Sequence, residues 1–246
     1  MFPFTGLLDL LCPPICPICG DVIENLAGND EPFCSVCTPK IVTPDGQFCR
    51  RCGGRRFVAA DNMDGCDRCR TAKFRFKRAI ALGEYENDLR LLTLRMKTDK
   101  TGILAIAAAK ALCIHRRTDL ENVHADTIVP VPMHFLRRWD RGVNSPEILA
   151  EELGRQLKIP VARHRIQRTR PTDLQYTLSP KGRAENVAGA FALRRQAAFA
   201  GKNVLLVDDI LTTGSTCNEI SKILLAAGAE SVTVVAAARA VGDYRQ

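Results

Sequence analysis

The sequence contains few aromatic residues and no long apolar segment. Phenylalanine, tryptophan and tyrosine make up 6% of its 246 residues, so the stacking platform that single-strand nucleic-acid binders use is not evident. Outside the N-terminal region the apolar stretches, residues 232–238 among them, are far shorter than the ~20 residues that span a bilayer. Residues 4–11 are mostly apolar, but no basic residue precedes Lys40, and a signal peptide needs a basic flank and a small-residue cleavage site. We therefore expect a cytoplasmic protein that does not insert into a membrane.

The overall composition is that of a folded protein. Apolar residues make up 46% and charged residues 25%, which disfavours wholesale disorder, collagen-like repeats and a disulfide miniprotein. At roughly 100–200 residues per domain, this length predicts one or two domains. The formal net charge is +8, but two metal ions, each held by four thiolates, would reduce it to about +4. The basic charge alone is therefore weak support for nucleic-acid binding.

Eleven cysteines are the most distinctive feature of the composition. In a reducing compartment they are more typical of metal ligands than of disulfides. Eight of them form four Cys-x-x-Cys units, which are Cys16 and Cys19, Cys34 and Cys37, Cys49 and Cys52, and Cys66 and Cys69. Two residues between paired cysteines let both thiolates of a tight turn reach one tetrahedral ion at about 2.3 Å. The repeat predicts two closed four-thiolate sites, and hence two structural zinc ions.

Two pairings of these units stay open. Consecutive pairing gives two successive zinc ribbons, whereas alternate pairing gives an interleaved cross-brace. Consecutive pairing is favoured because each half contains a knuckle followed by glycine, Gly20 or Gly53, then a short connection and a second knuckle. A redox dithiol is disfavoured because no thioredoxin-like pattern surrounds the units. Cys12, Cys113 and Cys217 are interpreted as incidental, the last two as small buried residues of helices.

Basic residues concentrate at the end of this cysteine-rich segment. Residues 1–39 contain five acidic residues and no lysine or arginine, while residues 40–78 contain eleven basic and four acidic residues. Such a segment can follow a phosphate backbone. It can equally form a scaffold or a surface on which another protein docks, and both interpretations stay open.

After about residue 78 the pattern alternates between strands and helices, which is typical of an α/β domain. The expected strands cover residues 78–85, 127–131, 204–207 and 232–238. The expected helices cover a segment with Leu89, Leu92 and Met96 at helical spacing, residues 103–115, a segment that begins with a capping hydroxyl at Ser145, and residues 216–227. Residues 163–195 are basic and poorly periodic, and are interpreted as a long functional loop or an irregular hairpin.

The most informative segment follows the strand at residues 204–207, a continuous apolar run that is typical of a strand buried on both faces. Asp208 and Asp209 come next, and a turn rich in threonine, glycine and serine then opens a helix. Ligands of α/β proteins bind at the carboxyl ends of strands, and backbone N–H groups at a helix N-terminus bind anions. A loop over residues 208–215 would therefore fit a sugar phosphate. The alternative is that the acids only close a strand and the hydroxyls only cap a helix.

This segment resembles the phosphoribosyl pyrophosphate motif of type I phosphoribosyltransferases, and the whole chain resembles the ComF family of competence-associated bacterial proteins. Besides the cysteines and the loop, the resemblance rests on Val129-Pro-Val-Pro132, on Arg137, Arg138, Arg141, Gly142 and Asn144, and on Gln175, Leu178, Arg183, Asn186, Gly189, Ala190 and Phe191. It implies an α/β fold with a type I phosphoribosyltransferase-like parallel sheet flanked by helices, preceded by a small cysteine-rich zinc-ribbon module. The implied boundaries are residues 1–76 for the double zinc ribbon and 77–246 for the transferase-like domain.

The same resemblance implies roles for individual residues. The acids would contact the ribose hydroxyls, the turn would wrap the 5′-phosphate, two arginines would bind the pyrophosphate, and Mg²⁺ would accompany the ligand. The implied binding residues are Asp208, Asp209, Thr212, Thr213, Gly214, Ser215, Thr216, Arg138 and Arg141, and the catalytic candidates are Asp208, Asp209 and Arg141. Residues 170–191 would form a hood over the site. Thr212 stands where purine salvage enzymes with a catalytic base carry aspartate, so the acceptor is unidentified.

Two functions follow as expectations. The first is a Mg²⁺-dependent phosphoribosyltransferase, or a phosphoribosyl pyrophosphate-binding protein, linked to DNA uptake in natural competence. The alternative is a non-catalytic adaptor that binds single-stranded nucleic acid and retains the fold. The expected partners are phosphoribosyl pyrophosphate, single-stranded DNA and other DNA-uptake proteins.

Overall fold

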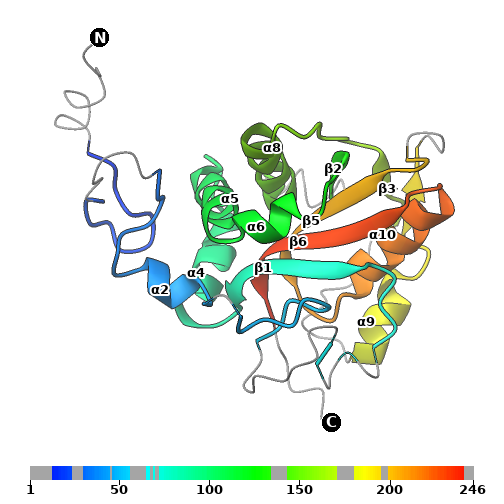
Figure 1. The fold of residues 1–246 in the computed structure, drawn as a ribbon, viewed down its shortest axis with the longest axis horizontal. Coiled ribbons are helices and arrows are strands. Elements are labelled where there is room, and N and C mark those ends of the chain that lie inside the picture. The colour runs from blue at the N-terminus through cyan, green and yellow to red at the C-terminus, as the bar shows by residue number, and fades with distance from the viewer. Residues whose placement is uncertain are drawn as a thin grey trace.

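The computed structural model describes residues 13–23, 30–44, 46–55, 65–66, 69, 72–133, 143–170, 180–194 and 199–240. Its centre is a parallel sheet with the strand order β1-β6-β5-β2. These strands are β1 (Arg78–Glu84), β2 (Thr127–Pro130), β5 (Asn203–Leu211) and β6 (Ser231–Arg239). Apolar side chains of these strands are buried on both faces, as expected of a parallel sheet. The predicted α/β architecture is confirmed (Figure 1).

Helices cover both faces of this sheet. They are α4 (Asn87–Met96), α5 (Ile103–His115), α6 (Arg117–Glu121), α8 (Ser145–Leu157), α9 (Pro180–Val187) and α10 (Ser215–Ala226). On one face, Leu205 of β5 belongs to the same apolar core as Leu92 of α4 and Leu149 of α8. On the other face, Leu206 belongs to a second core with Ile220 of α10. Among the described residues, no helix is long and apolar enough to cross a membrane.

Helix α5 begins and ends at the predicted residues, 103 and 115. Its sequence is rich in alanine, and its start is marked by Gly102, which adopts the left-handed conformation at φ 75°. The carboxylate of Asp99 accepts hydrogen bonds from the backbone N–H groups of Thr101 and Leu104, each at 2.9 Å. The bond from Leu104 satisfies a donor that the first turn of a helix leaves unpaired, and the bond from Thr101 holds the chain that leads into the helix.

Strand β5 is longer than predicted. The sequence predicts a loop from residue 208, but β6 continues to Arg239 and stays paired with β5 as far as Leu211. Pairing with a long neighbouring strand therefore overrides the local turn signal. Asp208 and Asp209 lie within the strand, where the ladder fixes their backbone, and the loop begins at residue 212.

The start of α8 also differs from the prediction. The N-cap residue is Asn144, and Ser145 is the first helical residue. Instead of capping its own helix, the Ser145 hydroxyl donates a hydrogen bond of 2.9 Å to the backbone oxygen of Met96, at the end of α4. Ser145 is buried at this junction. The side chain therefore joins two helices.

The basic segment at residues 163–195 contains more regular structure than predicted. Its ends form the antiparallel pair β3 (Ile166–Arg168) and β4 (Phe191–Leu193), as the hairpin interpretation expects. Helix α9 lies between them and was not predicted, because it starts at Pro180 and its sequence, PKGRAENV, contains few apolar residues. A hydrogen bond of 3.0 Å from the backbone N–H of Gly189 to Glu219 ties this segment to α10.

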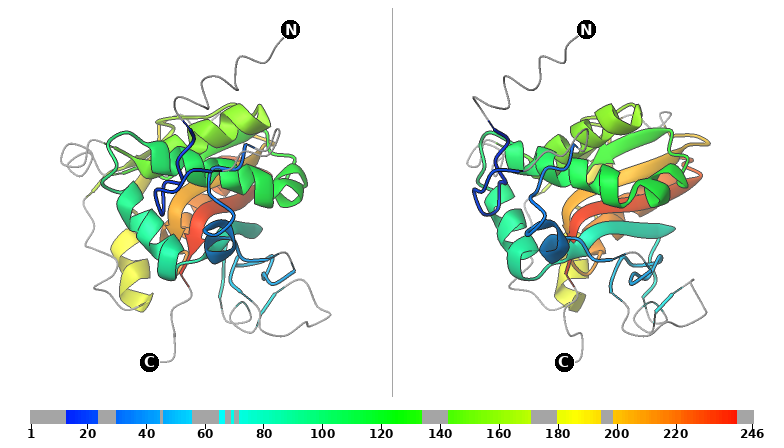
Figure 2. Two further views of the ribbon diagram at one scale, coloured as in Figure 1. Left: turned by 90° about the vertical axis from the view of Figure 1, so that its left-hand side faces the viewer. Right: turned by 60° about the vertical axis from the view of Figure 1, so that its left-hand side comes forward.

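The cysteine-rich segment divides into two parts that contact different regions of the domain. Cys16, Cys34 and Cys37 belong to the apolar core beside α4 and α5, next to the short helix α2 (Thr38–Ile41). Residues 46–55 lie along β1, where the backbone N–H of Ala79 donates to the carbonyl of Arg50 at 3.3 Å. Figure 2 shows the first part, in blue, beside the helices and the second, in lighter blue, beside the edge of the sheet.

Candidate functional site

The acidic pair lies at the carboxyl end of β5, and its two carboxylates point to opposite faces of the sheet because side chains alternate along a strand. On the α10 side, Oδ2 of Asp208 is 3.7 Å from the sulfur of Cys217. On the α4 side, Oδ2 of Asp209 is 3.8 Å from Nζ of Lys97. Both aspartates are partly buried. The pair therefore presents two oxygen-rich groups at the end of the strand, one of them beside a lysine.

Burial raises the pKa of Asp208 well above the usual range of aspartate, and the charge of Asp209 raises it further. The backbone N–H of Asp209 donates to Asp208 Oδ1 at 2.9 Å, which favours the ionised form, as does Lys97. Burial, followed by the nearby charge of Asp208, also raises the pKa of the Cys217 thiol. An additional cation or hydrogen-bond donor at this position would stabilise the ionised carboxylate.

The turn after β5 opens directly into α10. Gly214 precedes the helix in the left-handed conformation, at φ 80°. The hydroxyls of Thr213 and Ser215 are 2.8 Å apart, and the backbone N–H of Ser215 donates to Thr213 Oγ1 at 3.3 Å. Hydroxyls and backbone N–H groups thus gather at the positive end of a 12-residue helix. This arrangement suits a bound anion.

The structure places most of the predicted loop residues together. Asp208 and Asp209 lie near the carboxyl end of β5, Thr212, Thr213 and Gly214 form the turn, and Ser215 and Thr216 begin α10. The predicted pyrophosphate-side residues Arg138 and Arg141 lie outside the described residues, as do Arg137, Gly142, Gln175 and Leu178. Two contacts of the acidic pair were not predicted. Lys97 carries no motif, and Cys217 was interpreted only as a buried helix residue.

A polar hollow of about 280 Å³ lies beside this site, between the end of β2 and the β3–β4 pair. It is lined by residues that include Asn144, Glu147, His164, Gln167 and Arg194. Nε2 of His164 is 3.8 Å from Glu147 Oε1, and Arg194 donates to Gln167 at 3.0 Å. Because β2 pairs in parallel with β5, the hollow and the acidic pair both lie at the carboxyl ends of the strands. The hollow was not predicted from sequence, because its residues come from separate segments.

The eight paired cysteines form two groups. The first is Cys16, Cys19, Cys34 and Cys37, and the second is Cys49, Cys52, Cys66 and Cys69. This grouping confirms consecutive pairing. Sulfur-to-sulfur distances are 3.6 Å for Cys19 and Cys34, 3.6 Å for Cys49 and Cys69, and 3.7 Å for Cys52 and Cys66. A tetrahedral zinc ion about 2.3 Å from each sulfur would place the sulfurs about 3.8 Å apart, so both groups fit structural zinc.

Comparison with known proteins covers both parts of the chain. A family model described as a phosphoribosyl transferase domain matches residues 141–245, and a double zinc ribbon domain matches residues 7–70. Competence protein F of Haemophilus influenzae is 33% identical over 221 residues, which are 88% of this chain and 94% of that protein. This chain belongs to the ComF family. DNA utilization protein YhgH of Escherichia coli K12 is 31% identical over 92% of this chain and 96% of its own length. Competence protein ComFC of Bacillus subtilis is 26% identical over 81% of this chain and 80% of its own.

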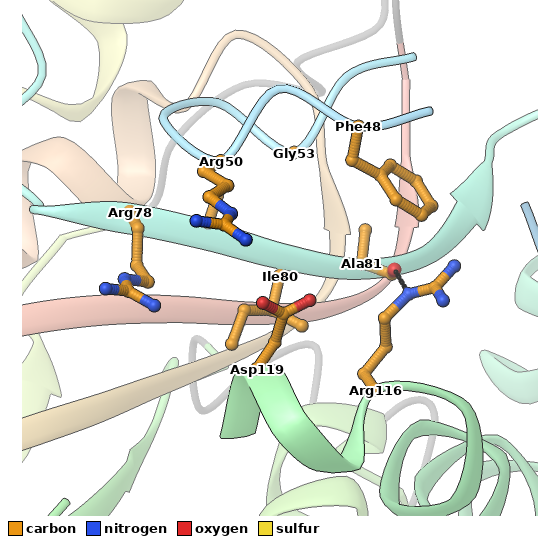
Figure 3. Close-up of a pocket in the computed structure, with 9 residues that line it drawn as sticks. Phe48, Arg50, Gly53, Arg78, Ile80, Ala81, Arg116 and Asp119 are labelled. Carbon is orange, nitrogen blue, oxygen red and sulfur yellow. Dashed lines mark hydrogen bonds between the residues drawn. The ribbon is translucent and has the colours of Figure 1, made fainter. Parts of the chain in front are cut away.

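A second surface feature of this ComF-family chain involves the basic segment. Arg50 and Arg78 line a small pocket on the edge strand β1, and Asp119 of α6 lies opposite them (Figure 3). The guanidinium of Arg116 also lines the pocket but is buried. It donates to the backbone oxygen of Ala81 at 2.9 Å, so it ties the start of α6 to the edge strand β1. The two more accessible arginines are therefore the pocket's candidates for contact with a phosphate.

Proposed function

We propose that this ComF-family protein binds phosphoribosyl pyrophosphate with Mg²⁺ at the carboxyl end of β5, and transfers the phosphoribosyl group in a role linked to DNA uptake. The observation that carries the proposal is the position of Asp208 and Asp209 near the carboxyl end of β5, with only the last two residues of the strand between them and the turn that opens α10. An anion site and a pair of carboxylates then lie within one short segment. This combination matches a sugar that carries both hydroxyls and a phosphate.

Each part of the segment has a distinct role in this proposal. The carboxylates of Asp208 and Asp209 accept hydrogen bonds from the ribose hydroxyls. The hydroxyls of Thr213 and Ser215, with backbone N–H groups at the start of α10, hold the 5′-phosphate. Arg138 and Arg141 bind the pyrophosphate, whose oxygens match the two parallel donors of a guanidinium. The ligand is thereby held along its whole length.

The donor set also fits Mg²⁺, which prefers oxygen ligands, keeps several waters and uses few protein carboxylates. Bound with the ligand, the ion would neutralise charge on the pyrophosphate and the ribose oxygens. Burial raises the pKa of Asp208, and the negative charge of Asp209 raises it further. Added positive charge at this position is therefore stabilising.

The reaction that such a site supports is displacement of pyrophosphate from the anomeric carbon of the sugar through a cationic transition state. The protein contributes orientation and electrostatic stabilisation rather than a nucleophile. Thr212 cannot accept a proton near neutral pH. We assign the acceptor to the polar hollow between β2 and the β3–β4 pair, where Glu147 and His164 offer groups that accept or donate protons.

The proposal is tested by calorimetry with phosphoribosyl pyrophosphate and Mg²⁺. The double variant Asp208→Asn with Asp209→Asn should bind more weakly by roughly 1.5–3 kcal/mol for each charged hydrogen bond lost. Glu121→Gln is the matched control, because this exposed carboxylate on α6 pairs only locally, with Arg117. Equal affinity of the folded double variant and the parent would refute the proposed site. Release of pyrophosphate on addition of an acceptor would establish turnover.

A non-catalytic adaptor that binds single-stranded nucleic acid is the second candidate. It is favoured by one observation, the position of Arg50 and Arg78 at the same pocket on the sheet edge. The name of the Escherichia coli relative, a DNA utilization protein, is consistent with either function. The two candidates involve different surfaces, so separate variants distinguish them.

A further inference from the structure

The last residue of β6, Arg239, joins the second cysteine group to the phosphate turn. Its side chain is buried, with 4% exposed. The guanidinium donates from Nε to the carbonyl of Cys52 at 2.7 Å and from Nη1 to the carbonyl of Leu211 at 2.8 Å. A third hydrogen bond goes to the carbonyl of Thr212, the first residue of the turn. One side chain thus fixes the distance between a zinc knuckle and the turn.

A second link runs through Arg51, which lies within the same knuckle, between Cys49 and Cys52. Its guanidinium donates to the carbonyl of Phe74 at 2.8 Å and to that of Lys77 at 2.8 Å. It also lies 5.8 Å from the ring centroid of Phe74. The knuckle therefore holds the segment that leads from the cysteine-rich module into β1.

That segment forms a wall of the phosphate turn. The rings of Phe74 and Phe76 stack with their centroids 4.6 Å apart. A side-chain carbon added at Gly214 would lie 3.1 Å from Phe74 Cε1, so the ring closely covers the glycine of the turn. The backbone N–H of Arg75 donates to the side chain of Asn218 in α10 at 2.5 Å. The turn is thus supported at residue 212 by Arg239 and at residue 214 by this wall.

We propose that the second cysteine group is part of the phosphate site, and that Arg239 and Arg51 are positioning residues that transmit the geometry of the Cys49–Cys52 knuckle to the turn at residues 212–216. The expected effect on ligand binding rests on the proposed function, whereas the expected effect on the structure of the turn does not. The first cysteine group serves as the contrast. Its residues Cys16, Cys34 and Cys37 pack into the core beside α4 and α5 instead.

The experiment compares the full-length variants Cys52→Ser and Cys19→Ser, each of which removes one ligand from one group. Hydrogen exchange is measured without any ligand, and zinc content is measured in parallel. Cys52→Ser should increase amide exchange at residues 212–218 by about tenfold or more, most clearly at Asn218, whose backbone N–H donates to the carbonyl of Gly214 at 2.7 Å, because opening of the turn becomes easier. Cys19→Ser should leave the exchange of these residues within about twofold of the parent. Binding of phosphoribosyl pyrophosphate, measured by calorimetry, should weaken by about tenfold only in Cys52→Ser.

A second pair of variants keeps all eight cysteines and covers the case in which Cys52→Ser does not fold. Arg51→Met removes the hydrogen bonds to residues 74–77, whereas Arg50→Met changes the neighbouring side chain of the same knuckle. Arg51→Met should retain both zinc ions and loosen the turn, while Arg50→Met should not loosen it. Arg239→Lys, which keeps the charge but loses the forked geometry, should also loosen the turn.

The two hypotheses fail in different ways. Unchanged exchange of residues 212–218 in Arg51→Met and in a Cys52→Ser variant that has lost a zinc ion would overturn the coupling. Increased exchange in a protein whose parent form does not bind phosphoribosyl pyrophosphate would uphold the coupling and reject the proposed function. Equal loosening by Cys19→Ser would also overturn the inference, because it would show that the whole cysteine-rich module acts through general destabilisation.

Discussion

Lys97 and Asp209 meet across the carboxyl end of the sheet, with Nζ of the lysine 3.8 Å from Oδ2 of the aspartate. Asp208, the preceding residue, points to the opposite face, toward Cys217. The adjacent carboxylates therefore have different surroundings although they share one strand end. Asp209 has a cation beside it, whereas Asp208 lies in a buried place where the negative charge of Asp209 also acts on it.

This difference predicts that Asp208→Asn stabilises the fold near neutral pH while it weakens ligand binding. The folded-state pKa of Asp208 is raised, so its contribution to stability is present at low pH and is lost as the pH rises through that pKa. The asparagine variant should have a higher melting temperature than the parent at pH 7–8, by about 2–4 °C for each kcal/mol. The difference should disappear below about pH 4, where aspartate is protonated in both states.

Thermal unfolding from about pH 3 to pH 8 measures this effect, and Asp209→Asn is the control. That variant loses the contact with Lys97 but also removes the negative charge that raises the pKa of Asp208, so it should gain less stability than Asp208→Asn at neutral pH. If Asp208→Asn were equally or less stable than the parent at every pH, the buried charge of Asp208 would not be the strained element of the site. A variant that is more stable than the parent but binds the ligand equally well would show that the charge of Asp208 is not needed for binding.

The fold was predictable where local pattern and tertiary pairing agree. Helix α5 and the strands β5 and β6 have strongly apolar sequences, and they were all predicted. The carboxyl end of β5 was not, because its pairing with β6 depends on a strand about 30 residues away. Helix α9 was missed because it carries little apolar periodicity. Local signals place an element, but its neighbours determine where it ends.

In the candidate site, too, only the residues that are close in sequence could be predicted to lie together. Asp208, Asp209 and the turn are adjacent in sequence, so their proximity could be predicted from the motif. Lys97 and Arg239 reach the site from α4 and β6, and their positions emerge only from folding. A basic residue after an apolar strand is ordinarily exposed. Arg239 is buried because backbone carbonyls from separate segments converge on it.

Metal content tests the cysteine pairing directly. We expect two zinc ions per chain in protein purified without chelator, since both four-cysteine groups fit tetrahedral coordination. The double variant Cys19→Ser with Cys34→Ser should retain one zinc ion, because both changes fall in the first group. The double variant Cys19→Ser with Cys52→Ser should retain none, because it disrupts both groups. The reverse result would indicate a cross-brace in solution.

Arg141 provides a test of the leaving-group side. Arg141→Ala should weaken binding of pyrophosphate by roughly 1.5–3 kcal/mol, the usual contribution of a charged hydrogen bond, and should affect ribose 5-phosphate much less. Arg117→Ala is a suitable control, because this exposed arginine of α6 forms an ion pair with Glu121 on the same helix. Competition experiments with each ligand measure the two affinities. Equal weakening of both would show that Arg141 acts on the whole site rather than on the pyrophosphate.

Salt dependence separates the nucleic-acid function from the small-molecule function. If the basic segment binds single-stranded DNA, the logarithm of the affinity should fall with the logarithm of the salt concentration by about 0.7 for each phosphate neutralised, with a total slope of roughly −2 to −4.

Arg50 and Arg78 line the pocket at the edge of β1. The double variant Arg50→Gln with Arg78→Gln should therefore make the slope shallower by about 1.4. Binding of phosphoribosyl pyrophosphate should be unaffected, because neither side chain belongs to the acidic pair or the turn. Arg51 is left unchanged in this test, since its hydrogen bonds hold the wall of the phosphate turn. An affinity for DNA that does not change with salt, or no binding at all near 50 mM salt, would reject this pocket as a nucleic-acid contact and favour protein docking on the same surface.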